Sequence, residues 1–291
     1  MMREQMPQLH NSRYGVDKYI EHFCLSAWVF PLTIISIMKK SRISLRQILG
    51  ELLLTAGAVL LLFAFYEAYW TNVESGKLQE QAQGELDETW QNPRKQLNPK
   101  LGEAFARMYI PAFGDDFQFA IVEGTDDNDL LRGPGHYENT QMPGEAGNFA
   151  VAGHRVGKGA PFNDLGSLNT CDAIVVETQT SWVTYRVLPV PWEDAPNLDC
   201  FNAPQKEKLH ADYAQAQGRH ITVPGDISVL EPVPSLSDAS PSEGVLTLTT
   251  CHPQFSNAER MIIHAMEVEN LPKTASSAAS AQRPAALEEN A

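Results

Sequence analysis

A cysteine at the end of one expected strand and an arginine at the start of the next form the first chemically suggestive pair in this sequence. Residues 245–250, VLTLTT, are apolar and β-branched and favour a strand, and Cys251 follows at its exit. After a loop at 252–257, a second strand is expected to begin just beyond Arg260. Because strands joined by such a loop run antiparallel, the two side chains are expected at the same end of a sheet. A guanidinium there would favour a thiolate and could donate to an oxyanion, although a buried thiol beside a surface arginine fits the same pattern.

A histidine that could move protons for this thiol lies about 100 residues earlier. Residues 148–153, NFAVAG, favour another strand, and His154 follows at its end. Imidazole is the side chain best suited to accept and return a proton near neutral pH. His136, in a Gly-Pro-Gly-His-Tyr turn, competes for the role, whereas His252 is expected to point away from Cys251. Spacing does not choose between His154 and His136.

Short strands must position these residues. From residue 101 onward, strand-like runs alternate with turns rich in Gly, Pro, Asp and Asn, which is typical of a closed or nearly closed β-barrel. The expected strands are residues 108–111, 118–122, 148–153, 173–178, 182–190, 227–232, 245–250 and 261–269. A short helix is expected to end at 104–108, and a second is expected at 205–217 within the long connection 191–226.

An apolar segment at residues 48–70 predicts a membrane anchor. It contains no Lys or Arg and is long enough, at about 1.5 Å per residue, to cross a hydrocarbon core of about 30 Å. Residues 1–47 hold 7 Lys and Arg against 3 Asp and Glu, whereas residues 71–291 hold 15 against 31. This asymmetry places the N-terminal segment in the cytoplasm and the large domain outside the cell. A buried core helix and a cleaved signal peptide are the alternatives.

The chain is therefore expected to have five parts. They are a cytoplasmic segment at 1–47, an anchor at 48–70, a polar and partly helical stalk at 71–100, a catalytic domain at 101–270 and a disordered tail at 271–291. The first part includes a second apolar run, at 23–38 and broken by Pro31, that is marginal for a span. Met38 is an alternative start.

Charge and cysteine content exclude some functions. The formal net charge of -14 argues against nucleic-acid binding, which needs a basic surface. Four cysteines without a C-x-x-C pair argue against a structural zinc site and against a disulfide scaffold. Cys171 and Cys200 would both lie outside the membrane, where a disulfide could persist, but two buried thiols fit equally well.

The sequence resembles the sortases, the membrane-anchored cysteine transpeptidases of Gram-positive bacteria. The run 247–251, TLTTC, matches the TLxTC signature, and Arg260 matches the arginine that opens the following strand. Residues 131–137, 142–148 and 152–155 resemble the blocks around the catalytic histidine, so the likeness spans 108–268. Cys-His-Pro followed by Glu-Arg is most similar to class E, the actinobacterial housekeeping type. Neither the C-terminal membrane helix nor the Asp-Pro-aromatic lid of pilin-polymerising sortases is present.

The resemblance implies an eight-stranded barrel, mainly β with short helices, behind one N-terminal transmembrane helix. It implies that Cys251 attacks the Thr carbonyl of an LAxTG or LPxTG sorting motif in a secreted protein. It also implies that His154 protonates the leaving amine, that Arg260 stabilises the oxyanion and that Thr250 and Leu248 contact the substrate. A peptidoglycan amine would then resolve the thioacyl enzyme. No cofactor or metal is implied, and the acidic run 126–129 is expected to be a solvated turn. A hydrolytic cell-wall peptidase, a pilin-polymerising sortase and a non-catalytic barrel are the alternatives.

Overall fold

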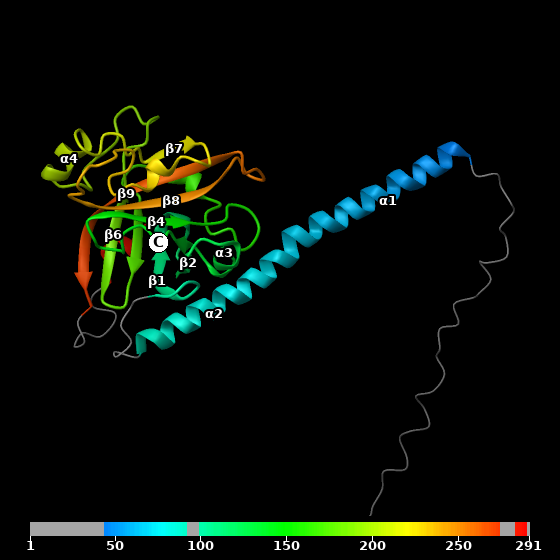
Figure 1. Cartoon of the computed structure of the whole chain (residues 1–291), viewed down its shortest axis with the longest axis horizontal. Coiled ribbons are helices and arrows are strands. Elements are labelled where there is room, and N and C mark those ends of the chain that lie inside the picture. Colours follow the sequence, from blue (N-terminus) through cyan, green and yellow to red (C-terminus); the bar gives the residue numbers. More distant parts are fainter. Residues whose placement is uncertain (1–43, 92–98, 274–282, 290–291) are drawn as a thin grey trace, which may run out of the picture. The chain divides into compact units, whose positions relative to one another are not determined.

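Nine strands form a single sheet that closes on itself (Figure 1), in a computed structural model that describes residues 44–91, 99–273 and 283–289. The strands are β1 (Ala104–Tyr109), β2 (Gln118–Glu123), β3 (Gly135–His136), β4 (Gly147–Ala152), β5 (Ala173–Glu177), β6 (Ser181–Val187), β7 (Arg219–Thr222), β8 (Gly244–His252) and β9 (Glu259–Pro272). Their order is β6-β5-β1-β2-β3-β4-β8-β9-β7, and a further β6–β9 pairing closes the ring. Eight strands thus form a closed barrel and β7 lies outside the ring, so the predicted eight-stranded barrel is confirmed.

The strand directions decide what meets at each end of the barrel. Two neighbouring pairs, β2–β3 and β4–β8, are parallel, and the other pairs are antiparallel. Parallel neighbours leave the sheet at the same edge, whereas an antiparallel neighbour enters there. The ends of β4 and β8 therefore meet the beginning of β9.

Alternating side chains build one core inside the barrel and a second outside β8 and β9, besides two smaller clusters elsewhere in the described residues. The barrel interior includes Phe149, Leu246 and Leu248, all at most 1% exposed. On the outer face, Val245 and Met266 pack against residues of the long connection between β6 and β8, among them Tyr213. This second core covers the outer face of β8 before the strand reaches Cys251.

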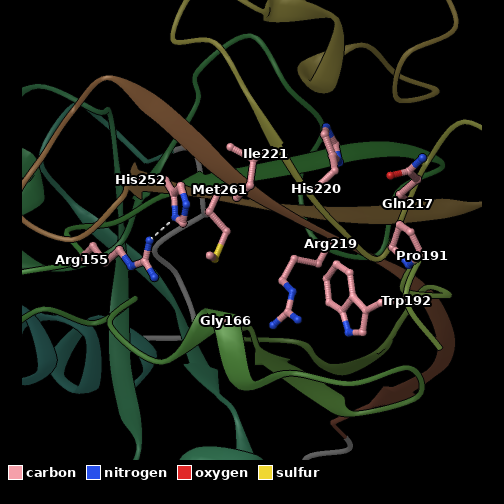
Figure 2. A pocket seen from close by; sticks show the side chains of 10 residues that line it. All are labelled: Arg155, Gly166, Pro191, Trp192, Gln217, Arg219, His220, Ile221, His252 and Met261. Atoms are coloured by element: carbon pink, nitrogen blue, oxygen red, sulfur yellow. Dashed lines mark hydrogen bonds between the residues drawn. The ribbon is translucent and has the colours of Figure 1, made fainter.

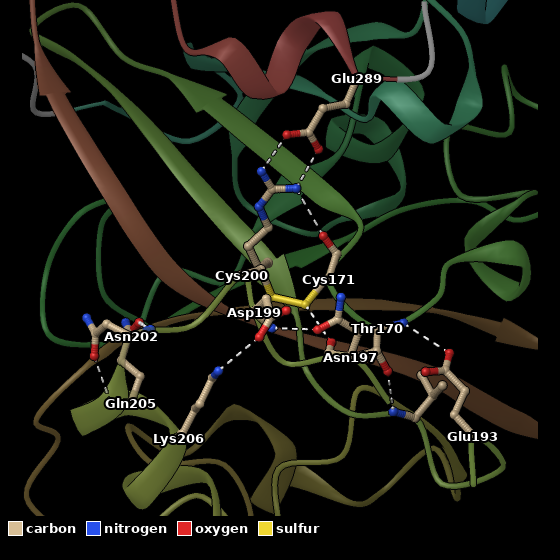
Figure 3. The surroundings of a disulfide bond; sticks show 12 residues. Thr170, Cys171, Glu193, Asn197, Asp199, Cys200, Asn202, Gln205, Lys206 and Glu289 are labelled. Carbon is tan, nitrogen blue, oxygen red and sulfur yellow. Dashed lines mark hydrogen bonds and ion pairs between the residues drawn. A yellow bond between two sulfur atoms is a disulfide. The ribbon is translucent and has the colours of Figure 1, made fainter. Parts of the chain in front are cut away.

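The long connection is held to the barrel by a disulfide between Cys171 and Cys200 (Figure 3), whose Cα atoms are 5.8 Å apart. The bond decides between the two alternatives that the sequence left open. The helix expected at 205–217 is shorter in the structure, where α4 spans Ala203–Leu209 and turns follow. Asn202 caps α4 by accepting a hydrogen bond from the backbone N–H of Gln205.

Helix α2 (Thr71–Gln91) lies within the segment predicted as a polar stalk, and it packs on the barrel. Its Ala82 and Leu86 are fully buried against Ala104, Ala120 and Val122 of β1 and β2. The small helix α3 (Asp127–Arg132) follows β2 and also lies beside α2. The acidic run 126–129, expected to be a solvated turn, instead begins α3, where Asp126 and Asp129 form the capping box.

Helix α1 (Leu45–Phe65), followed by a π-helical turn at Tyr66–Trp70, overlaps the predicted anchor. Among the described residues it is the one helix long and apolar enough to cross a membrane, and none of its residues is buried. This finding agrees with a single N-terminal transmembrane helix by length and composition. The second apolar run at 23–38 lies outside the described residues.

The C-terminal segment departs from the disordered tail expected from residue 271. Strand β9 continues to Pro272, and Lys273 donates to a carboxylate oxygen of Glu177 at 2.8 Å. A 3-10 turn at Ala285–Glu288 buries Ala286 against β5 and β6, and Arg186 forms an ion pair with Glu289. Short 3-10 turns also occur at Pro111–Phe113 and Leu165–Ser167.

Two predictions of local structure were wrong. Residues 104–108, expected to end a helix, belong to β1 because pairing with β2 and β5 outweighs the helix preference of Ala and Met. The expected strand at 227–232 contains a 3-10 turn at Ile227–Leu230, where Asp226 accepts from the N–H of Ser228. The two shortest strands, β3 and β7, were missed.

Candidate active site

Three neighbouring strands, β4, β8 and β9, bring the candidate catalytic residues to one end of the barrel. In the parallel β4–β8 pair, Ala152 is the partner of Thr249. Two residues further on, His154 lies just beyond the end of β4, and Cys251 is the penultimate residue of β8. In the antiparallel β8–β9 pair, Cys251 is the direct partner of Arg260. The hairpin predicted from the sequence therefore has the expected register.

The three residues also share a face of the sheet. Alternate residues on these strands enter the barrel core, namely Phe149 and Val151, Leu246 and Leu248, and Met261 and Ile263. His154, Cys251 and Arg260 lie an odd number of residues from these core positions, which places them on the opposite, outer face of the sheet. A Cβ on Gly153 would meet the core ring of Phe162 at 2.5 Å, so the backbone continues this alternation up to His154.

Cys251 is a free, partly exposed thiol, and it is the one cysteine of the described residues outside the disulfide. Arg260 is also partly exposed. Its Nη1 donates to the backbone carbonyl oxygens of Asn257 at 3.1 Å and Glu259 at 3.0 Å. These bonds use part of a five-donor guanidinium, and no ion pair among the described residues occupies the rest. The remaining N–H groups are available to an oxygen of the substrate.

His154 is partly buried, and its Nε2 atom is buried without a hydrogen-bond partner among the described residues. Burial lowers the pKa of His154, the positive charge of Lys158 lowers it further, and Asp127 acts in the opposite direction. The imidazole is therefore neutral near pH 7 and can accept a proton.

His136, the competing histidine, has a structural position. It pairs with Val151 across β3 and β4, which places it on the core side of the sheet, opposite to Cys251. Its ring is 1% exposed and packs on Phe105, and its Nδ1 lies 2.9 Å from Oε2 of Glu123. Geometry thus separates the two histidines that spacing left equivalent.

The two residues expected to contact the substrate do not reach the surface. Leu248 is 0% exposed and belongs to the barrel core. Thr250 is 3% exposed, and its hydroxyl donates to the carbonyl oxygen of Gly153 at 2.8 Å. The expectation needs correction, because both side chains point into the framework. Thr250 instead joins the ends of β8 and β4 and so fixes the spacing between Cys251 and His154.

Arg155 is a site residue to which the sequence analysis assigned no role. Its Nη1 donates to the carbonyl oxygen of Cys251 at 3.3 Å and to Nδ1 of His252 at 2.5 Å. His252 points away from the thiol, as predicted. The signal for Arg155 was its place directly after His154, which sends its side chain to the opposite face. Among the described residues, no group of His, Cys, Asp and Glu could hold a metal ion.

The chain matches a family model described as "Sortase domain" over residues 108–268. It is 34% identical over 234 residues to Sortase SrtE1 of Streptomyces coelicolor, an alignment that covers 78% of this chain and 58% of that protein. Sortase SrtE2 of the same organism is 26% identical over 232 residues, which are 75% of this chain and 79% of the relative. The chain thus spans less than two thirds of the length of the first relative. These names agree with the resemblance to class E.

Among solved structures, the SrtF sortase from Corynebacterium diphtheriae is 61% identical, with a TM-score of 0.61. The match covers 68% of this chain and 98% of that structure, so it includes essentially the whole solved domain.

Proposed function

The chain belongs to the sortase family, and from this we propose that it is a membrane-anchored cysteine transpeptidase of class E type. It cleaves a C-terminal sorting motif of secreted proteins, of LAxTG or LPxTG type, between Thr and Gly. It then transfers the Thr carbonyl to an amine of peptidoglycan. The observation that carries this proposal is the convergence of Cys251, His154 and Arg260 on one face at one end of the barrel.

The first half of the reaction makes a thioester. His154 accepts the thiol proton of Cys251, and the thiolate sulfur attacks the Thr carbonyl carbon. The C–S bond forms, the C–N bond to Gly breaks, and the imidazolium gives its proton to the departing amine. The lowered pKa of His154 supports this role, because it makes the imidazolium a stronger acid that gives its proton readily to the departing amine.

The second half reverses these roles with a new amine. Neutral His154 takes a proton from the incoming amine as its nitrogen attacks the thioester carbonyl. The C–N bond forms, the C–S bond breaks, and Cys251 regains its thiol through proton return from the imidazolium. Water in place of the amine would give a free Thr carboxylate.

Arg260 stabilises the negative oxygen that develops in both halves. It is the cross-strand neighbour of Cys251, and the described part of the chain offers it no carboxylate partner. A planar guanidinium can direct two N–H groups at one oxygen or at two acceptors, which a lysine ammonium does only as a point charge. Loss of one such donor typically slows turnover by about 10²–10³.

The enzyme would act outside the cell. Lys39, Lys40, Arg42 and Arg46 precede the apolar segment 48–70, so the positive-inside rule places residues 1–47 in the cytoplasm. The anchor at 48–70 then holds the catalytic domain, 101–270, on the extracellular side of the membrane. An oxidising exterior also suits the Cys171–Cys200 disulfide.

Product analysis tests this proposal. The full-length chain in detergent micelles is incubated with LAxTG and LPxTG peptides, with and without a peptide amine. We expect an amide product with the amine present, and we expect Cys251→Ala and His154→Ala to give none. Arg260→Lys should be slowed by about 10²–10³, whereas Arg132→Lys, a matched change in the ion pair with Glu85 that joins α3 to α2, should not.

Each contrary outcome points to a named alternative. A free Thr carboxylate as the sole product, whatever the amine, would indicate a hydrolytic peptidase. Preference for a lysine side-chain amine of a pilin would indicate a pilin-polymerising enzyme. Turnover by Cys251→Ala would remove the basis of the proposal.

A further inference from the structure

A pocket of about 450 Å³ lies at the end of the barrel that carries the candidate catalytic residues (Figure 2). We call it the cationic pocket, and the lining residues that matter here are Arg155, Trp192, Arg219, His220, His252 and Met261. Arg155, His252 and Met261 directly follow His154, Cys251 and Arg260 in the sequence. The pocket is therefore lined by the sequence neighbour of each member of the site.

Positive charge dominates the pocket. Figure 2 shows the Arg219 guanidinium stacked against the indole of Trp192, and its central carbon lies 3.8 Å from the ring centroid. Neither Arg219 nor Arg155 takes part in an ion pair among the described residues. Three carboxylates lie in the surroundings: Glu193 near Arg219, Asp226 near His220 and Glu259 at 4.0 Å from His252. Unpaired guanidinium groups in a cleft are suited to bind a carboxylate or a phosphate, with Arg able to do so through two parallel bonds.

Apolar surface accompanies this charge. Trp192 is 51% exposed and Ile221, on β7, is 42% exposed, and both line the pocket. A bare inorganic ion would leave this surface in water, whereas a short peptide would cover it and still present a carboxylate to Arg219. The volume also lies in the range of pockets for small organic ligands.

A direct contact links the pocket to the nucleophile. Arg155 projects into the pocket and donates to the carbonyl oxygen of Cys251 at 3.3 Å. Its Nε is buried without a hydrogen-bond partner in the described part of the chain.

We propose that the cationic pocket is the acceptor subsite, where Arg219 binds a carboxylate of the peptide whose amine resolves the thioacyl enzyme. The inference rests on the proposed transpeptidase function and adds the chemistry by which the second substrate is selected. Trp192 and Ile221 cover the peptide, and Arg155 is a positioning residue between the pocket and Cys251.

Competition between two acceptors that differ in one charge tests this inference. The full-length enzyme receives a sorting-motif peptide together with triglycine or triglycine amide, and aminolysis is measured relative to hydrolysis. The readout is a ratio, so any change in the rate of acylation cancels. We expect wild type to prefer the free acid by roughly tenfold or more, as is typical for a charge-assisted hydrogen bond.

Arg219→Gln should abolish that preference, and Arg219→Lys should retain part of it. The matched variant Arg132→Gln, which changes a partly buried arginine paired with Glu85 outside the pocket, should keep the preference. Circular dichroism and thermal unfolding establish that each variant is folded. Equal use of acid and amide by wild type, or an unchanged preference in folded Arg219→Gln, would overturn the inference.

Two further arms separate the alternatives. Competition by inorganic pyrophosphate without any preference for the free acid would show that the pocket selects phosphate, which contradicts the carboxylate assignment. Formation of the acyl-enzyme without acceptor tests the proposed function alone. Its absence would disprove that function, whereas its presence with no acid preference would disprove only the acceptor subsite.

Discussion

The disulfide between Cys171 and Cys200 is expected to contribute several kcal/mol to the stability of the barrel. It closes a loop with a sequence separation of 29 residues, which contains β5, β6 and the start of the long connection. The chain-entropy relation for a loop of this length gives about 3.6 kcal/mol at 25 °C. For a domain of this size, a loss of that magnitude lowers the Tm by roughly 7–14 °C.

The assay compares Cys171→Ser, Cys200→Ser, the double variant and the reduced wild type by thermal unfolding. Because either single substitution breaks the same bond, we expect all four to lose nearly the same stability. The disulfide restricts the unfolded chain, and a single substitution already removes this restriction, so the second substitution adds no further loss. Figure 3 shows the bond among polar contacts at the base of the connection, and these should persist in every variant. Additive losses in the double variant, or no change on reduction, would mean that the two residues stabilise the protein as separate thiols.

Three further perturbations follow from buried groups. Burial lowers the pKa of His264, which is 0% exposed, from 6.5 to about 3. The unfolded chain therefore binds a proton that the folded chain does not, so the free energy of unfolding should fall as the pH drops from about 6.5 towards 3. Urea midpoints measured across this range should fall less in His264→Gln than in wild type. An equal fall in the two proteins would contradict the assignment. His136→Ala should cost about 1–3 kcal/mol because it leaves Glu123 without its buried partner, and peptide turnover measured well below the Tm should persist. Leu86→Ala should cost about 2–5 kcal/mol in urea unfolding because Leu86 fills the contact between α2 and the barrel, and a loss below 1 kcal/mol would mean that α2 is not docked there.

The barrel was predictable where strands are long and alternate clearly. The runs around β2, β4, β5, β6, β8 and β9 were located within a few residues, because apolar and β-branched side chains alternate with turn signals there. β3 has two residues and β7 has four, so both are too short for the alternation of apolar and polar side chains to be detected. The packing of α2 was also invisible to composition, since only Ser75, Ala82 and Leu86 of its 21 residues are buried.

The site was predictable as a set of residues but not as a geometry. The hairpin between Cys251 and Arg260 followed from local sequence, because an antiparallel loop fixes its own register. Spacing left His154 and His136 equivalent, and the resemblance to the sortases pointed to His154. The β4–β8 pairing, which joins residues about 100 positions apart, supplies the geometric reason. Leu248 was misassigned because a signature match does not say which face of the strand a side chain occupies.

Mass spectrometry of the trapped acyl-enzyme tests the assignment of Cys251 most directly. The full-length chain in detergent is mixed with a sorting-motif peptide without an amine acceptor, quenched in acid, reduced, digested and mapped. We predict the acyl group, ending in the Thr carbonyl, on the peptide that contains Cys251 and on no other cysteine-containing peptide, with none in Cys251→Ala. An acyl group on another residue, or its persistence in Cys251→Ala, would contradict the assignment of the nucleophile.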